Sequence, residues 1–306
     1  MPASEPDLAS RRYELWRCPG CGCAVTGGEP APELHEQGAF RPARPRLHRV
    51  AGPALRAFDH QRLTLLGQVA LPGARILDAG AGRGRFVLRA RAAGYDAMGI
   101  DPYRGLAERG DAPGCGCGGG EATVLAASIE EASIPARSLG AVTLWHVLEH
   151  LENPRAALER IAGWLVPGGG LVVGVPNLAS LQARIGGERW YHLDVPRHRS
   201  HFTPAGLSQL LNDTGFQVAA IEHRLLEHNP FGMWQTVLNR VSSEPSWLYN
   251  VLKRNARLSA RELALTALAI PLMPLAAAVE LAAGQAHRGG TIAVLARRRG
   301  AGEQAG

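Results

Sequence analysis

Lysine is nearly absent from this sequence of 306 residues. Of its 33 basic residues, Lys253 is the one lysine, and the arginines are spread along the whole chain. No dense basic stripe is interleaved with aromatic residues, which make up 6% of the sequence. The formal net charge of +6 therefore reflects a bias in composition. We expect no nucleic-acid partner.

Cysteine is also scarce, and the N-terminal segment lacks a long apolar core. Five cysteines in a chain of this length do not form a disulfide framework, which fits a reducing compartment. The first residues contain no apolar stretch of signal-peptide length. These absences predict a cytoplasmic protein. Because 46% of the residues are hydrophobic, the chain has enough material for a buried core.

Glycines are concentrated after a short apolar run, Ile76-Leu77, that reads as a buried strand. Asp78 ends that run, and Gly80, Gly82 and Gly84 occupy alternate positions before a helical pattern begins. Glycines let the backbone turn tightly and leave no Cβ between the amides and a ligand. The first N–H groups of the following helix suit a ligand that accepts hydrogen bonds. The stretch predicts a nucleotide-binding strand, loop and helix.

A second acid follows at the tip of the next predicted strand. Asp101 comes 23 residues after Asp78, where a carboxylate is placed to bind both hydroxyls of a ribose. The loop has the pattern Asp-x-Gly-x-Gly-x-Gly, which differs from the dinucleotide-binding pattern. Asp78 would repel a pyrophosphate but could face a cation. A ligand with a ribose, an ammonium group and no phosphate therefore fits better than NAD.

Four motifs together resemble class I S-adenosylmethionine-dependent methyltransferases. The motifs are Ile76 to Gly84 with Gly99-Ile100-Asp101, His146 to Leu151, Pro167 to Gly170, and Pro196-Arg197-His198 before His201-Phe202-Thr203. The combination is similar to the branch of ubiquinone-biosynthesis-type O-methyltransferases. The resemblance implies an α/β fold: a Rossmann-like, seven-stranded, mostly parallel sheet with an antiparallel last strand and helices on both faces.

The resemblance also implies S-adenosylmethionine as the cofactor and a set of residues that bind it. Asp78 would help to hold the ammonium group, and Asp101 the ribose hydroxyls. The implied cofactor-binding residues are Asp78, Gly80, Gly82, Gly84, Asp101, Ser128, Ile129, His146 and Val147.

Polar residues gather at the carboxyl end of the fourth predicted strand, where open α/β sheets bind ligands. A hydroxyl acceptor needs a group that takes its proton near the transition state. His150 is the first candidate for this base, followed by His198 and Glu149. Residues 190–198 are dense in hydrogen-bonding side chains and form the candidate acceptor-facing loop, although His198 could instead pin that loop. We expect no metal in the catalytic site.

The pattern of apolar residues predicts the remaining elements. Helices are expected over 49–71, 155–166 and 203–213, and strands over 121–127, 139–148, 171–175, 217–222 and 290–296. This gives four regions: an N-terminal segment and linker over 1–48, a methyltransferase core over 49–225, an apolar helical insertion over 226–289, and a last core strand with a tail over 290–306.

The N-terminal segment contains a cysteine knuckle, Cys18 to Cys23. A structural zinc needs four ligands, and the knuckle supplies two or three. Zinc at Cys18 and Cys21 would need further ligands such as Cys115 and Cys117. We favour a degenerate zinc-ribbon-like segment with free thiols.

The insertion contains an uncharged apolar run of 17 residues, Leu263 to Val279, interrupted by Pro271 and Pro274 and preceded by four basic residues. Three interpretations stay open. The run could be a proline-bent helical pair that forms a lid or a homodimer face, a membrane-surface anchor over 253–283, or a membrane span. We disfavour the span because it would separate the last strand from its sheet.

Two other functions remain possible on the sequence alone. A nicotinamide-dependent oxidoreductase shares the first strands and Asp101, but its loop spacing differs. A catalytically inactive partner protein would keep the same fold. The small-molecule acceptor is not identified by the sequence, and a quinone-like phenol, a sugar and a lipid-linked intermediate all fit.

Overall fold

The computed structural model describes residues 13–28, 52–102, 124–243, 245–252 and 257–300. The chain divides into two compact units. The sheet unit consists of Arg49–Val175, Leu207–Glu222 and Ala293–Gly306. The helical unit consists of Met1–His48, Pro176–Gly206 and His223–Ile292. Residues 176–206, which the sequence places in the core, thus group with the N-terminal segment and the insertion.

A seven-stranded sheet forms the centre of the sheet unit, in the order β5-β4-β3-β6-β7-β10-β9. Strands β3 to β7 pair in parallel, and β10 pairs antiparallel with β9. The strands are β3 (Arg75–Ala79), β4 (Asp96–Asp101), β5 (Val124–Ala126), β6 (Leu139–Trp145), β7 (Leu165–Pro176), β9 (Phe216–Glu222) and β10 (Thr291–Arg298). The predicted Rossmann-like fold class is confirmed. The strand order reverses between β3 and β6, which is where such sheets bind ligands.

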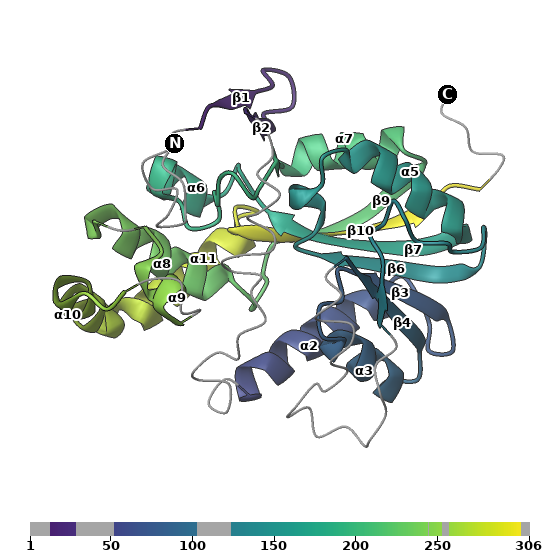
Figure 1. Cartoon of the computed structure of the whole chain (residues 1–306), viewed down its shortest axis with the longest axis horizontal. Helices are drawn as coiled ribbons and strands as arrows, with labels where there is room; N and C mark the ends of the chain where they lie inside the picture. Colours follow the sequence, from purple (N-terminus) through teal and green to yellow (C-terminus); the bar gives the residue numbers. More distant parts are fainter. Residues whose placement is uncertain (1–12, 29–51, 103–123, 244, 253–256, 301–306) are drawn as a thin grey trace. The chain divides into compact units, whose positions relative to one another are not determined.

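Helices cover both faces of this sheet, as Figure 1 shows. Helices α2 (Gly52–Gly67) and α3 (Arg85–Ala92) lie on one face, and α5 (Pro154–Trp164) and α7 (Pro204–Asp213) on the other. With both faces covered, the central strands are mostly apolar, and Val142, Leu144 and Val173 are fully buried. Asn153 begins α5 by accepting a hydrogen bond from the N–H of Ala156 at 3.0 Å.

Two predicted strand boundaries were wrong, and the helix expected to end at residue 71 ends at Gly67. Strand β6 ends at Trp145 rather than at 148, because His146 has a positive φ of 56° that no strand adopts. Strand β7 begins at Leu165 rather than at 171, and the helix before it ends at Trp164. Leu165 pairs with Leu139, and the register shifts before Gly170 pairs with Ala141. The glycine-rich stretch is therefore an irregular part of a strand.

The helical unit contains most of the insertion and a small sheet. Its helices are α6 (Leu181–Gly186), η4 (Gly187–Arg189), α8 (Asn229–Val241), α9 (Trp247–Leu252), α10 (Ala260–Ala269), η5 (Ile270–Leu272) and α11 (Met273–Gln285). Strands β1 (Leu15–Arg17) and β2 (Ala24–Thr26) enclose the cysteine knuckle. Strand β8 (Ser200–His201) adds to β2 as the third strand. The N-terminal hairpin is thus completed by a segment far along the chain.

A buried polar network holds the start of β10 within the helical unit. The side chain of Asn229 accepts a hydrogen bond from the Thr291 N–H at 2.8 Å. Glu280 accepts one from the Gly290 N–H at 2.7 Å. Glu280 is 2% exposed. Burial raises its pKa to about 7, against smaller opposite effects of its hydrogen bonds with Gly290 and Gln182.

We predict that Glu280→Gln stabilises the protein above pH 7. The native pKa of Glu280, about 7, exceeds the unfolded value of 4.5, so between these values the native state binds more protons. Stability is therefore lost as pH rises through this window, by about 2–3 kcal/mol from this group. Glutamine keeps the acceptor for Gly290 and cannot ionise. Denaturant unfolding at pH 5 and pH 8 measures the effect.

Glu262→Gln is the matched control, because this buried glutamate has a shift of the opposite sign. Burial raises its pKa, but hydrogen bonds from Ser242 and Ser243 outweigh burial and lower it overall. Its replacement should destabilise the protein at neutral pH. An unchanged pH dependence in Glu280→Gln would contradict the assignment.

Candidate functional site

The glycine loop between β3 and α3 is tied to the end of β4. The N–H groups of Gly80 and Ala81 donate to the Ile100 carbonyl at 2.8 and 3.0 Å. The Gly82 N–H donates to the Asp101 carboxylate at 2.9 Å. The two predicted motifs therefore meet, because β3 and β4 are parallel neighbours that end at the same edge.

The loop requires glycine for two physical reasons. Gly80, Gly82 and Gly84 have φ values of 77°, 55° and 73°, a region that other residues rarely adopt. A Cβ on Gly80 would also lie 2.3 Å from a methyl carbon of Val147. Among the described residues, no atom lies within 4 Å of the Cβ position at Gly82, so the loop is open on that side with respect to this part of the chain. This is the cradle that a ligand in contact with the backbone needs.

The two acids of the site lie in different surroundings. Asp101 is 6% exposed and is held by the loop N–H. Asp78 pairs in register with Thr143, whose hydroxyl donates to its carboxylate at 2.6 Å. Burial raises the pKa of Asp78 to about 6, and the Thr143 hydrogen bond and Arg62 partly offset this. A buried carboxylate of this kind is stabilised by a cation beside it.

Helix α3 begins at this loop without a side-chain cap. Gly84 occupies the N-cap position in a left-handed conformation, and no side-chain hydrogen bond caps the helix there. The first N–H groups of a helix need partners from outside the helix. A ligand that accepts hydrogen bonds or carries a carboxylate can supply them. These two features fit the chemistry of the amino-acid part of S-adenosylmethionine: a buried carboxylate would suit its ammonium group, and the first N–H groups of α3 would suit its carboxylate.

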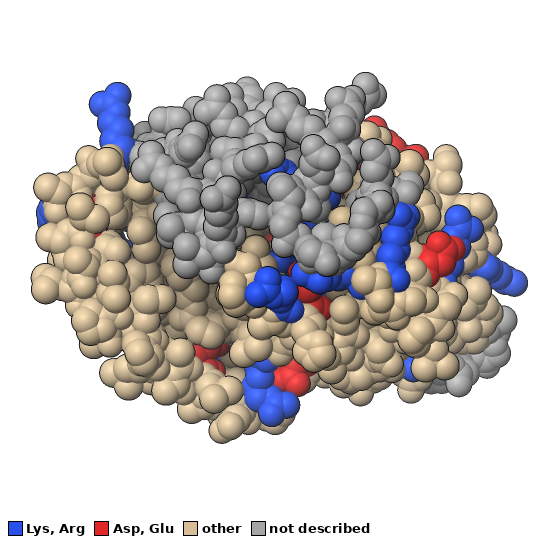
Figure 2. Space-filling model, turned by 90° about the horizontal axis from the view of Figure 1, so that it is seen from below, with Lys and Arg blue, Asp and Glu red and all other residues tan. Residues whose placement is uncertain are grey.

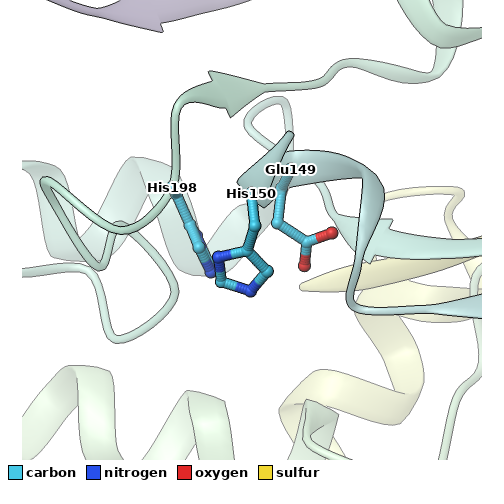
Figure 3. A group of neighbouring side chains, drawn as sticks. All are labelled: Glu149, His150 and His198. Carbon is cyan, nitrogen blue, oxygen red and sulfur yellow. The ribbon is translucent and has the colours of Figure 1, made fainter. Parts of the chain in front are cut away.

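The residues after β6 form the other side of the predicted site. His146 has a strained backbone, and its Nδ1 lies 3.1 Å from Oε1 of Glu149. Glu149 is 1% exposed, whereas His150 is partly exposed. Figure 3 shows Glu149 and His150 projecting from η3 (Leu148–His150), the short turn after β6. Glu149 thus serves to orient His146, and His150 is the more accessible polar group.

Sequence reasoning missed two further residues at this edge. Arg62 of α2 places its guanidinium 4.8 Å from the ring centroid of Trp145, and 5.9 Å from that of Phe86. The buried indole Nε1 of Trp145 has no hydrogen-bond partner among the described residues. Thr143, the partner of Asp78, could have been found from the expected parallel pairing of their strands. Arg62 could not, because the sequence does not give the rotation of α2.

Ser128 and Ile129, the predicted adenine-side residues, follow β5. The Ser128 hydroxyl accepts a hydrogen bond from the Glu131 N–H at 3.2 Å, and the Glu131 carboxylate accepts one from the Ser128 N–H at 3.2 Å. This reciprocal pair is a capping arrangement that fixes the turn. Ile129 is buried. Cofactor contact by this pair stays a prediction.

His198 belongs to the helical unit and is described there by itself. Its Nδ1 lies 2.9 Å from the His192 carbonyl oxygen, and its Nε2 lies 3.8 Å from a carboxylate oxygen of Asp194. Asp194 also pairs with Arg197. The ring, drawn in Figure 3, comes from the loop that leads into β8. These contacts pin the loop, which is one of the two interpretations left open by the sequence.

The cysteine knuckle contacts the start of α7 in the same unit. The Cys23 sulfur accepts a hydrogen bond from the Thr203 N–H at 3.3 Å, and the Thr203 hydroxyl donates to the Cys21 carbonyl at 2.7 Å. Cys18 is exposed, and Cys21 and Cys23 are half-buried free thiols. Cys115 and Cys117 lie outside the described residues. Zinc at Cys18 and Cys21 stays a prediction.

The sequence matches a family model described as a methyltransferase domain over residues 46–221, more than half of the chain. The chain therefore belongs to this methyltransferase family, and the fold and loop place it in the class I group that uses S-adenosylmethionine. No curated protein matches the sequence.

Solved structures similar to this chain share its fold at low identity. A [4+2]-cyclase, SpnF, is 19% identical with a TM-score of 0.50, and the match covers 79% of this chain and 80% of that one. A structure of the Haloferax volcanii complex of the Trm112 methyltransferase activator and a putative methyltransferase is 14% identical with a TM-score of 0.52. That match covers 84% of this chain and 100% of the other. A putative sarcosine dimethylglycine methyltransferase from Galdieria sulphuraria is 15% identical with a TM-score of 0.50. The match covers 82% of this chain and 88% of that one.

Gly80→Ala should lower the free energy of unfolding by roughly 2–4 kcal/mol, because it adds both backbone strain and a clash with Val147. In the double variant with Val147→Ala the clash is removed, so its loss should be smaller than the sum of the single losses. Gly82→Ala is the control, since it meets strain without a clash. Denaturant unfolding of wild type, the two single variants, the double variant and the control measures these losses. Additive losses in the double variant would contradict the close approach of Gly80 and Val147.

Proposed function

We propose that this chain transfers the methyl group of S-adenosylmethionine to an oxygen atom of a small-molecule acceptor, including a lipid- or sugar-linked one. The observation that carries the proposal is the hydrogen bond from the Gly82 N–H to the Asp101 carboxylate, 2.9 Å long. This contact holds a ribose-binding acid beside a glycine cradle that opens to a ligand. A second acid, Asp78, lies buried at the start of the same loop.

The residues that follow β3, β4, β5 and β6 have separate proposed roles in holding the cofactor. Asp101 binds the ribose hydroxyls, and Asp78 holds the ammonium group directly or through water. Ser128 and Ile129 border the adenine, and His146 and Val147 line the pocket. Burial raises the pKa of Asp78 to about 6, and an ammonium group beside the carboxylate would favour its charged form.

When bound, S-adenosylmethionine supplies a methyl group that its sulfonium has already activated. The protein must therefore align the acceptor oxygen with that methyl group, and proximity accounts for much of the rate. A hydroxyl acceptor must also lose a proton near the transition state. His150 is the first candidate to take it, because its side chain is the more accessible polar group on η3. His198 and Glu149 are the next candidates.

Methyl transfer has to be measured directly, because a [4+2]-cyclase has the same fold and fold alone does not define activity. A nicotinamide-dependent oxidoreductase and an inactive partner protein would also share features of the site. Tritiated S-adenosylmethionine with phenolic, sugar and lipid-linked acceptors separates these functions. Transfer of the label to one acceptor class would support methyltransferase activity and define that class. Cofactor binding without any transfer would favour the inactive partner protein.

His150→Ala should lower turnover of the responsive acceptor by about 10²- to 10⁴-fold, the usual contribution of a general base. Cofactor affinity should be unchanged, because His150 is not assigned to the cofactor. His60→Ala, which replaces an exposed histidine of α2, is the matched control and should keep full activity. Full turnover in His150→Ala would overturn its assignment as the base, and the same assay would then be applied to His198→Ala.

A further inference from the structure

The helical segment from α10 to α11 turns its apolar side chains outward. Leu268 is 76% exposed, and Leu275 is 62% exposed. The residues that face the protein are polar or small: Glu262 and Glu280 are 2% exposed, and Thr266, Ala283 and Gly284 are buried as well. We call the outward side the apolar face; its residues are Leu263, Leu268, Ile270, Leu272, Leu275 and Leu281. This arrangement is the reverse of that in a helix packed on a soluble core.

Specific polar contacts fix this orientation. The Glu262 carboxylate accepts hydrogen bonds from the hydroxyls of Ser242 and Ser243 at 2.6 and 2.7 Å. The Trp234 indole of α8 donates to the Ala269 carbonyl at 2.7 Å. Rotating the segment to bury its leucines would break these bonds and expose α8. The outward direction of the apolar face is therefore set by the packing within the helical unit.

The charge beside the apolar face is positive. Arg257 precedes α10, Arg261 lies in its first turn, and Arg288 follows α11. All three are exposed. In the sequence, Lys253 and Arg254 come just before them. The acidic residues between 257 and 288, Glu262 and Glu280, are both buried. Figure 2 shows that blue and red side chains are sparse on the left of the view, over α8 to α11. An exposed apolar patch of this kind marks an interaction site.

A membrane span does not fit the connections of this segment. Residues 260–285 are long and apolar enough to cross a bilayer by length and composition, with a hydropathy of 1.8. However, the chain leaves the sheet at β9 and returns in β10, and these strands pair with each other. Both ends of the insertion must therefore lie on one side of a bilayer. Pro271 and Pro274 also interrupt the helix at η5.

We propose that the apolar face docks on the surface of an anionic lipid bilayer, with α10 and α11 lying in the interface. The leucines enter the boundary of the acyl chains, and the arginines contact anionic headgroups. A second copy of the chain fits less well as the occupant. A two-fold contact through this face would bring its arginines toward arginines, with no exposed acid between 257 and 288 to pair with them.

Flotation of the full chain with vesicles tests this proposal. The vesicles contain equal parts of phosphatidylglycerol and phosphatidylcholine, or phosphatidylcholine alone. Wild type should float with the anionic vesicles at low salt and much less with the neutral ones. Leu268→Gln with Leu275→Gln should weaken binding by at least about tenfold. Leu71→Gln, at a leucine that is 77% exposed outside this face, is the matched control and should bind like wild type.

A charge variant and a measurement of association complete the test. Arg257→Gln with Arg288→Gln should weaken flotation several-fold and reduce its dependence on salt. This variant keeps all the leucines of the apolar face. Sedimentation velocity in the absence of vesicles should give a monomer. No flotation of wild type at low salt overturns the proposal, whether the chain is monomeric or dimeric. Equal flotation of the Leu71 and Leu268/Leu275 variants overturns it as well. Neither readout depends on catalytic activity.

Discussion

The candidate site depends on three N–H donors of the glycine loop, two of which bind the Ile100 carbonyl and one the Asp101 carboxylate. These bonds require a backbone that lies close to β4 with positive φ values. Gly99 contributes, because a Cβ there would lie 2.5 Å from that of Ala81. Strand pairing places Asp101 at the end of β4, and the glycines let the loop N–H reach its carboxylate.

The apolar pattern predicted most of the individual strands and helices, and the family resemblance implied how the strands are arranged in the sheet. Two strand boundaries failed where the backbone is irregular, at His146 and before Gly170, because the pattern of residues does not report a local change of register. Within the site, Asp78, the loop glycines and Asp101 were predictable because they follow consecutive strands. Contacts such as Arg62 with Trp145 depend on how a helix is rotated, which the sequence does not determine.

The insertion shows why composition alone left three interpretations open. An uncharged run of 17 residues is compatible with a lid or homodimer face, a membrane-surface anchor and a span, and only the position of the last strand disfavours the span. The burial pattern separates them, because the two glutamates face the protein and the leucines face outward. The pairing of β9 with β10 adds a topological constraint that hydropathy does not contain. In the proposed account, the same chain combines a sheet that binds a small-molecule cofactor with a helical surface that docks on lipid.

Calorimetric titration of S-adenosylmethionine into wild type and Asp101→Asn tests the central claim most directly. Hydrogen bonds to a charged group are worth about 1.5–3 kcal/mol, so losing the carboxylate's ribose contacts should weaken binding at least about tenfold. Asp96→Asn, at the exposed start of the same strand, is the control and should bind like wild type. No binding to wild type, with NADH titrated alongside, would contradict the account. Equal binding by both aspartate variants would remove Asp101 from the site.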